Sequence, residues 1–464
     1  MSSGSTISSD STLRSNDGEP PAATPEPSSP ANEETRESIV LLISFCRFAE
    51  AIAVGMLVPI LPTFLAQLPA GGSERWSQGL ESSAPWLTSW FPALVQPTAE
   101  SRTALLFFLA GMAMSASQMF AGRLSDRFDR RKIFIVTGML GGAIGSAAFA
   151  WSESYSDLLT TRLLQTACLG LTFPPMMAIV ARHSSPGRGG RMLGLYSTIR
   201  LLGFSLGPIV GGLLAELGGY NATFLGSSCL LLVSIGLVAW LVPDPREGSL
   251  SRKERRERPS VPWMFRLLGT SSFLMMVGIS AIISLFPAYQ EEFGATEFQL
   301  SIVFTAFIGT RCLFQYASGW IGDRFDKKRL LLGALAALGP LIALQGMVSS
   351  LTQLIVLRAG IGIVSAAMSA SIGGISAERS VPGNRARVMG INTMCFTLGV
   401  SIGPLLTGFI PDRATAFLIP GVAAWIWFVV IAMVVPSDRN FQLSDQAVAP
   451  KTPVSPSPQR MTPA

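Results

Sequence analysis

Long apolar runs separated by short polar segments dominate the chain. Twelve runs come close to or exceed the ~20 mainly apolar residues that a helix needs to cross the hydrocarbon core of a bilayer. They span residues 39–65, 104–121, 133–151, 158–181, 192–217, 224–242, 267–289, 300–318, 330–350, 354–377, 388–410 and 416–435. The pattern predicts an all-α membrane protein with twelve transmembrane helices.

The polar segments divide the chain into five parts. Residues 1–37 and 437–464 are rich in Ser, Pro and Thr and lack apolar periodicity, which predicts two disordered tails. Residues 38–243 and 266–436 each hold six apolar runs, and the basic residues 244–265 join them. This linker is interpreted as a solvated connector, with binding to anionic lipid as the alternative. The first run is too long for the apolar core of a signal peptide, so it is expected to be retained.

The basic residues orient the helices. If the N-terminus is cytoplasmic, the inner loops hold 22 Lys and Arg residues, and the outer loops hold only Arg75, Arg102 and Arg413. Cytoplasmic loops carry an excess of Lys and Arg. Both termini are therefore expected on the cytoplasmic side of a cell membrane. The long first outer loop contains Trp76, Trp86 and Trp90, whose rings favour the membrane interface.

Composition excludes several classes of protein. Charged residues make up 14% of the chain, against roughly 25% in soluble domains. The net charge of +6 does not indicate nucleic-acid binding, because the basic residues lie in short loops between apolar runs. Five separate cysteines and the single His183 give no disulfide framework and no metal site. Neither a phosphate-binding loop nor a nucleophile triad is present, so we expect no catalytic residues, no cofactor and no ATP-driven step.

Three features repeat at nearly one spacing. The loop that starts at Gly122 (GRLSDRFDRRK) recurs at Gly319 (GWIGDRFDKKR), 197 residues later. Arg162 recurs as Arg358, and the stretch GFSLGPIVGG from Gly203 recurs as GVSIGPLLTG from Gly399, both 196 residues later. Two halves with six helices each have the same orientation, so they should be related by an axis along the membrane normal, with a substrate site between them.

Over residues 38–436 the chain resembles the major facilitator superfamily. The loop signature of that family is matched twice, by residues Gly122, Leu124, Asp126, Arg127, Arg130 and Arg131 and by Gly319, Gly322, Asp323, Arg324, Lys327 and Lys328. Both copies depart from it where Asp129 and Asp326 replace the usual Gly. Asp126 beside its arginines can form charge-assisted hydrogen bonds, so Gly122, Asp126, Arg127, Arg130, Arg131, Gly319, Asp323 and Arg324 are predicted to act as a cytoplasmic latch. The alternative is a simple topological anchor.

The glycine-rich stretch of the fifth run is predicted to pack helices closely. The signature consists of Gly203, Gly207, Pro208, Gly211 and Gly212, with Gly399, Gly403, Pro404 and Gly408 as its second copy. Small residues at this spacing are also typical of ordinary helix contacts. The stretch resembles the antiporter signature of the drug:proton exporters, which implies export.

Few charges lie inside the predicted helices. They are Arg47, Glu50, Arg162, Arg200, Arg311, Arg358 and, at the outer end of a helix, Glu216. Glu50 lies ~17 Å from the start of the first run, at ~1.5 Å per residue, near the midplane. A charge at that depth requires a partner or a cavity.

Arg47 and Glu50 are three residues apart on one helix face, and two interpretations stay open. The residues satisfy each other as a structural pair, or Glu50 exchanges protons during transport, since burial favours its neutral form and the nearby arginine its charged form.

Arg162, with Gly170 eight residues later, resembles the Arg of the exporters that is linked to proton coupling. Glu50 and Arg162 are therefore the proton-coupling candidates. Arg47, Arg200, Arg311 and Arg358 are candidates for lining the substrate cavity, and they leave anionic substrates open.

The most favoured hypothesis is a monomeric secondary transporter that exports small amphipathic molecules in exchange for protons, in a bacterial inner membrane. An importer or facilitator for a nutrient or organic anion is the alternative. A membrane sensor with the same fold is the third hypothesis.

Overall fold

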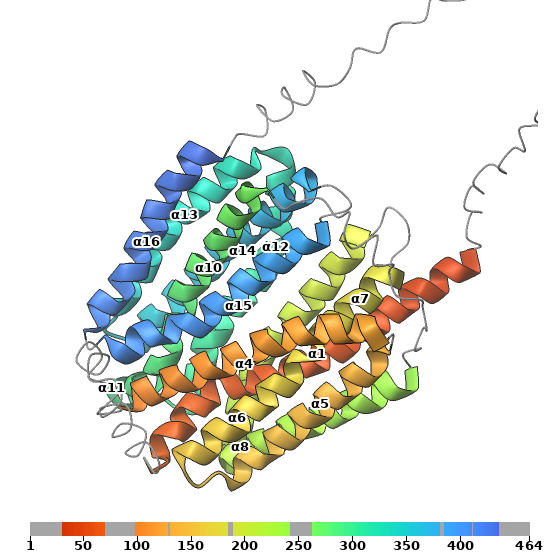
Figure 1. Cartoon of the computed structure of the whole chain (residues 1–464). Helices are drawn as coiled ribbons and strands as arrows, with labels where there is room; N and C mark the ends of the chain where they lie inside the picture. The colour runs from red at the N-terminus through yellow and green to blue at the C-terminus, as the bar shows by residue number, and fades with distance from the viewer. Residues whose placement is uncertain are drawn as a thin grey trace, which may run out of the picture.

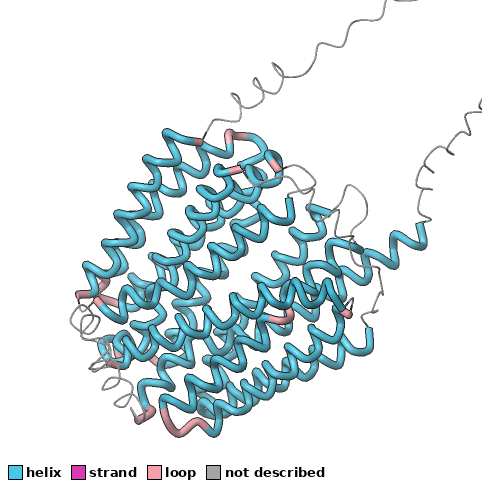
Figure 2. Tube along the Cα trace, viewed as in Figure 1, coloured by secondary structure: helices cyan, strands magenta, loops and turns pink. Residues whose placement is uncertain are grey.

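The computed structural model describes residues 30–69, 98–128, 130–183, 189–241, 262–380, 385–410 and 412–435. All regular structure in these residues is helical, as Figure 2 shows. The linker 244–261, most of the first outer loop with its three tryptophans and the C-terminal tail lie outside the described residues.

The first half contains α1 (Pro30–Gln67), α4 (Ala99–Phe128), α5 (Arg131–Ala148), α6 (Tyr155–Gly170), α7 (Phe173–His183) and α8 (Gly189–Leu241), with a short 3-10 turn, η2 (Phe149–Trp151). The second half contains α10 (Trp263–Ser280), η3 (Ala281–Leu285), α11 (Phe286–Phe293), α12 (Glu297–Arg324), α13 (Lys327–Leu344), η4 (Gln345–Met347), α14 (Leu351–Arg379), α15 (Arg385–Phe409) and α16 (Arg413–Val434).

The helices account for the twelve predicted membrane crossings. Eleven stretches of the described residues are long and apolar enough to cross a membrane, and one of them, Gly194–Trp240, is 47 residues long. At ~1.5 Å per residue it is far longer than one crossing needs. Gly219 interrupts it with φ 73° and ψ −178°, a backbone conformation that favours glycine. α8 therefore contains the fifth and sixth crossings.

The predicted boundary of the N-terminal tail is wrong. α1 begins at Pro30, so residues 30–37 are helical rather than part of a disordered tail. Proline suits the first position of a helix because its fixed φ is helical and its missing N–H would be unpaired there. The prediction failed because it started the helix where the apolar run starts.

Glycines pack the fifth crossing of each half onto the first crossing of the same half. Gly203 and Gly207 of α8 lie against the carbonyl oxygens of Phe48 and Ile52 in α1. Gly399 and Gly403 of α15 lie in the same way against the carbonyl oxygens of Phe273 and Val277 in α10. At the third position the halves differ: Gly211 touches the carbonyl of Met56, whereas the Thr407 hydroxyl donates a hydrogen bond to the carbonyl of Ala281.

The two halves meet along two equivalent seams, α8 with α12 and α15 with α4. Small residues face each other in both: Gly309 lies against Ser205, and Gly111 lies against Ser401. Further along, Gly212 lies against Ser301, and Gly408 lies against Ala104. The glycine signature thus contributes Gly212 and Gly408 to the contact between halves.

The Gly309 and Gly111 contacts lie near the middle of the crossings, and the Gly212 and Gly408 contacts lie toward one end of the bundle. We call it the far end, and we call the opposite end, where α1 begins and α16 ends, the basic end. In Figure 1 the two groups of helices are close near α11 and diverge toward the basic end.

A polar network joins the halves at the far end. The Gln67 side chain donates to the Tyr220 hydroxyl (2.9 Å), which donates to the Glu297 carboxylate (2.8 Å). Gln290 of α11 donates to the same carboxylate oxygen (3.0 Å). The structure is therefore closed at the far end.

The glycine packing gives a direct test of stability. A methyl group at Gly207 would lie 2.7 Å from the Ile52 carbonyl oxygen and 2.8 Å from the Gly55 Cα, both backbone atoms that cannot rotate away. We expect Gly207→Ala to destabilise the protein by about 1–3 kcal/mol through overpacking, measured as a lower thermal unfolding midpoint in detergent.

Gly236→Ala is the matched control on the same helix, because no atom lies within 4 Å of the added methyl group. It should leave the midpoint unchanged or raise it slightly, since alanine favours helix over glycine. Equal midpoints for the two variants would contradict the packing described.

Candidate functional site

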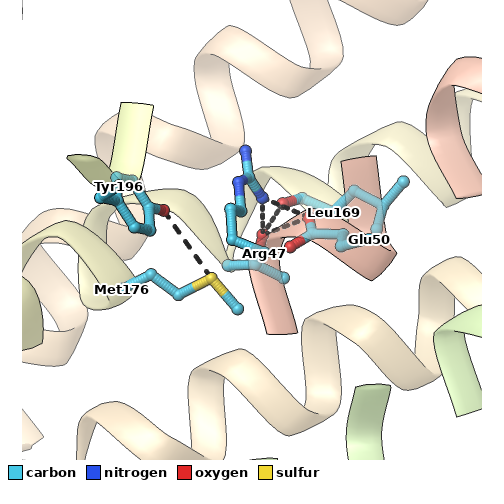
Figure 3. Close-up of polar contacts among 6 residues, drawn as sticks. Arg47, Glu50, Leu169, Met176 and Tyr196 are labelled. Atoms are coloured by element: carbon cyan, nitrogen blue, oxygen red, sulfur yellow. Dashed lines mark hydrogen bonds and ion pairs between the residues drawn. The ribbon is translucent and has the colours of Figure 1, made fainter. Parts of the chain in front are cut away.

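Glu50 forms a buried cluster with Arg47 and Thr172. An ion pair of 2.5 Å joins Arg47 Nη1 to Glu50 Oε1 within α1. The Thr172 hydroxyl lies 3.0 Å from the same carboxylate oxygen and 3.5 Å from Arg47 Nη1. Glu50 is only 3% exposed, so the structural pair anticipated from the spacing is formed, with a third partner from another helix. Figure 3 shows Arg47 and Glu50 pointing toward each other.

Thr172 lies where the fourth crossing is interrupted. α6 ends at Gly170, and α7 starts at Phe173 with Pro174 and Pro175 in its first turn. A proline lacks the N–H that would continue the hydrogen bonding of the preceding turn. The break leaves the Leu169 carbonyl 2.8 Å from the Thr172 hydroxyl. Irregular backbone at membrane depth is tolerated where it is buried in protein, and interrupted helices commonly form binding sites.

The sequence interpretation missed Thr172, although the two consecutive prolines were a signal for it. It also missed Tyr196, which is buried with its hydroxyl 3.9 Å from the sulfur of Met176 (Figure 3). The Arg47 guanidinium lies over the Phe173 ring, 5.4 Å from its centre. Glu50 Oε2 and Arg47 Nε have no hydrogen-bond partner among the described residues. The cluster is therefore compact, but not all of its polar atoms form hydrogen bonds.

Arg162 does not contact Glu50. Its Nη1 donates to Gln165 Oε1 (2.7 Å), Gln165 donates to Ser146 (2.7 Å), and the Ser227 hydroxyl lies 3.3 Å from Ser146. Ser227 in turn donates to the carbonyl of Ala53 in α1. Neutral dipoles thus surround the Arg162 charge, and the chain of hydrogen bonds reaches α1 one turn beyond Glu50.

Arg358 holds the equivalent place in the second half and is fully buried. It donates to the Ile279 carbonyl (2.8 Å) and to Gln345 Oε1 (3.3 Å), and it lies over the Phe307 ring. Both arginines are paired with a glutamine, but Gln165 and Gln345 stand at different positions of the repeat. Arg358 is enclosed within its own half, so the structure does not bring it together with the other cavity candidates.

Arg200 and Arg311 lie on facing helices of the two halves. Arg200 of α8 lies over Phe204, and Arg311 of α12 lies over Phe396. Arg311 also donates to the Ser369 hydroxyl (2.9 Å). Among the described residues, neither arginine has an acidic partner within ion-pair distance.

The predicted latch lies at the basic end. The side chains of Gly122, Asp126, Arg127 and Asp323 lie outside the described part of the chain. Arg130 is exposed, and Arg324 is stacked on Trp320 at 3.9 Å. A side chain at Gly319 would meet nothing within 4 Å. The latch itself stays a prediction.

Asp326 caps α13, since its carboxylate accepts a hydrogen bond from the Lys328 N–H (2.9 Å). An aspartate serves this role better than the glycine usual in the loop signature, because its side chain pairs a free N–H of the first turn. Lys328 in turn donates to the Ala432 carbonyl near the end of α16, and Lys132 donates in the same way to the Ala239 carbonyl near the end of α8. Lysine at a helix C-terminus also offsets the helix dipole.

A comparison of this chain with models of known protein families identifies its family. The family model of the Major Facilitator Superfamily matches residues 43–270 and 268–460. The chain belongs to the Major Facilitator Superfamily. It is therefore a multi-pass membrane transporter, and the expected fold of two six-helix halves is confirmed.

Curated relatives in this superfamily are distant but cover most of the chain. The multi-drug resistance efflux pump PmrA of Streptococcus pneumoniae is 24% identical, over 78% of this chain and 86% of the pump. The quinolone resistance protein NorA of Staphylococcus aureus is 23% identical, over 80% of this chain and 90% of that protein. The crystal structure of a bacterial homolog of the human lysosomal transporter Spinster matches with a TM-score of 0.61 at 15% identity, over 90% and 98% of the two chains.

The Thr172 contact predicts a change in the stability of this superfamily member. Thr172→Val removes one hydrogen bond to the buried carboxylate of Glu50 at nearly constant volume, and a hydrogen bond to a charged group contributes about 1.5–3 kcal/mol. We expect a lower thermal midpoint than in the unaltered protein, because the buried carboxylate of Glu50 loses a donor.

Thr166→Val is the control, because its hydroxyl contacts only the carbonyls of Arg162 and Leu163 in its own helix. Thr166→Val should lower the midpoint less than Thr172→Val does, because no buried charge loses a donor. An equal loss in the two variants would mean that the contact of Thr172 with Glu50 adds nothing to the stability of the fold.

Proposed function

We propose that this protein exports small amphipathic molecules across a bacterial plasma membrane by alternating access, in exchange for protons bound at Glu50. The observation that carries the proposal is the buried Glu50–Arg47–Thr172 cluster at the break between α6 and α7. Support for export comes from the relatives named as a multi-drug resistance efflux pump and a quinolone resistance protein, and from the glycine–proline stretch of α8.

The proposed orientation places the basic end, with both termini, in the cytoplasm. It rests on the excess of Lys and Arg in the loops at that end. The halves touch at the far end, which this orientation places on the outer side of the membrane.

A single hydrogen atom links protonation to the helix break. The Thr172 hydroxyl has one hydrogen and two acceptors, Glu50 Oε1 and the Leu169 carbonyl. When Glu50 is charged, Thr172 donates to the carboxylate. When Glu50 takes up a proton, the carboxyl donates to Thr172, and the hydroxyl hydrogen is free to turn to Leu169 at the end of α6.

Protonation also removes the charge that Arg47 neutralises. The ion pair then weakens, and the junction between α1, α6 and α7 changes its hydrogen bonding. Such a change in a few contacts at an interrupted helix is how we propose that a proton biases the equilibrium between the two carrier states. A proton that crosses 100 mV supplies ~2.3 kcal/mol for this step.

Transport in inside-out membrane vesicles tests the proposal. With an acidic lumen, we expect uptake of amphipathic fluorescent dyes that stops when the pH gradient is collapsed. Glu50→Gln keeps the size of the side chain but cannot titrate, so it should abolish gradient-driven uptake.

Glu216→Gln is the matched control, because Glu216 is an exposed carboxylate in α8 and lies toward the far end. It should transport as the unaltered protein does. Gradient-driven uptake by folded Glu50→Gln protein would exclude Glu50 as the coupling group. No uptake of any dye by the unaltered protein would count against export itself.

A further inference from the structure

Two arginines without acidic partners mark the surface between the halves. A charge inside a membrane protein is costly unless it is paired, hydrogen-bonded or in contact with water. Arg47 is neutralised by Glu50, and the guanidinium groups of Arg162 and Arg358 donate to side-chain or backbone oxygens within their own halves. Within the described residues, the Arg200 guanidinium lies over the Phe204 ring. The Arg311 guanidinium lies over the Phe396 ring and donates to one hydroxyl, and its Nε has no hydrogen-bond partner.

The helix register brings the two arginines to one level. The carbonyl of Ser205 in α8 accepts a hydrogen bond from Thr305 in α12, and Ser205 lies against Gly309. The two helices run in opposite directions. Arg200 therefore lies ~7.5 Å along α8 from Ser205, and Arg311 lies ~3 Å along α12 from Gly309, both toward the basic end. Each side chain is half-buried, and the two charges are close enough to repel each other.

The charges around them do not cancel. Arg200 also interacts electrostatically with Arg47, Glu50 and Tyr196. Tyr196 is neutral, and Arg47 and Glu50 offset each other, so Arg200 and Arg311 leave two positive charges on this surface. The rings of Phe204 and Phe396 beside them supply apolar contact.

We propose that Arg200 and Arg311 form a binding site, one arginine from each half, for the anionic group of an amphipathic molecule whose apolar part contacts Phe204 and Phe396. A carboxylate or sulfonate there accepts hydrogen bonds from guanidinium groups, the pairing that arginine favours. It also offsets the repulsion between the two arginines.

The site has a consequence for the proton at Glu50. A bound anion disfavours a second negative charge nearby, so it favours protonation of Glu50. Binding of an anion should therefore take up protons from solution. An anion and a proton would bind together at this site, whereas the exported molecules of the proposed function would exchange with the proton.

Equilibrium binding tests this inference without any gradient, and so independently of export. The protein in nanodiscs is titrated with a fluorescent naphthalenesulfonate and with its uncharged sulfonamide of the same ring system, and empty nanodiscs correct for lipid partition. We expect the sulfonate to bind at least tenfold more tightly. Arg200→Gln and Arg311→Gln should each remove this preference and leave sulfonamide binding unchanged.

Two further variants keep the test specific. Arg311→Lys retains the charge and should retain part of the preference, whereas Arg266→Gln, at an exposed arginine at the basic end, should change nothing. Sulfonate binding should take up protons in a weakly buffered solution, and Glu50→Gln should bind the sulfonate without this uptake. Equal affinity for the two ligands, a preference that survives both glutamine variants, or proton release on binding would overturn the proposal.

Discussion

The cost of a charge in hydrocarbon controls where this chain places its ionisable side chains. Glu50 is close to the middle of the first crossing and is enclosed, and it is tolerated there because Arg47 is one turn away and Thr172 is brought to it from the broken fourth crossing. The Thr172 hydroxyl also lies 2.8 Å from the Leu169 carbonyl at the end of α6, which accepts the Thr172 backbone N–H as well. The Thr172 hydroxyl therefore connects the ion pair of the first crossing to the break between α6 and α7 in the fourth crossing.

The two halves share their packing and differ in their charges. Glycines contact the same backbone positions in both halves, and Gly–Ser contacts form both seams. Arg162 recurs as Arg358, but three other charges inside the helices are not repeated: Ser272 and Met275 stand where the first half has Arg47 and Glu50, and Phe396 stands where it has Arg200. The repeat thus builds the scaffold, and the ion pair and the anion site that we propose are specific to one half or to the junction between halves.

Much of the fold could be predicted from the sequence, because apolar runs and loop charges are strong, local signals. The crossings and the duplication follow from apolar length and spacing alone, whereas the spacing of Arg47 and Glu50 made their pairing one of two interpretations that stayed open. Contacts between distant helices do not: no local pattern places Thr172 beside Glu50, pairs Arg358 with Gln345 or brings Arg200 level with Arg311. The N-terminal boundary of α1 was wrong because helices continue beyond the apolar run that defines a crossing.

The central claim is that Glu50 changes its protonation state while it is enclosed by Arg47 and Thr172. Infrared difference spectroscopy between acidic and alkaline pH measures this directly, through the carbonyl stretch of a protonated carboxyl group in an apolar environment. The account predicts such a band in the unaltered protein, its loss in Glu50→Gln and a shifted band in Thr172→Val. Identical difference spectra for the unaltered protein and Glu50→Gln would mean that Glu50 stays charged and that the ion pair with Arg47 is purely structural.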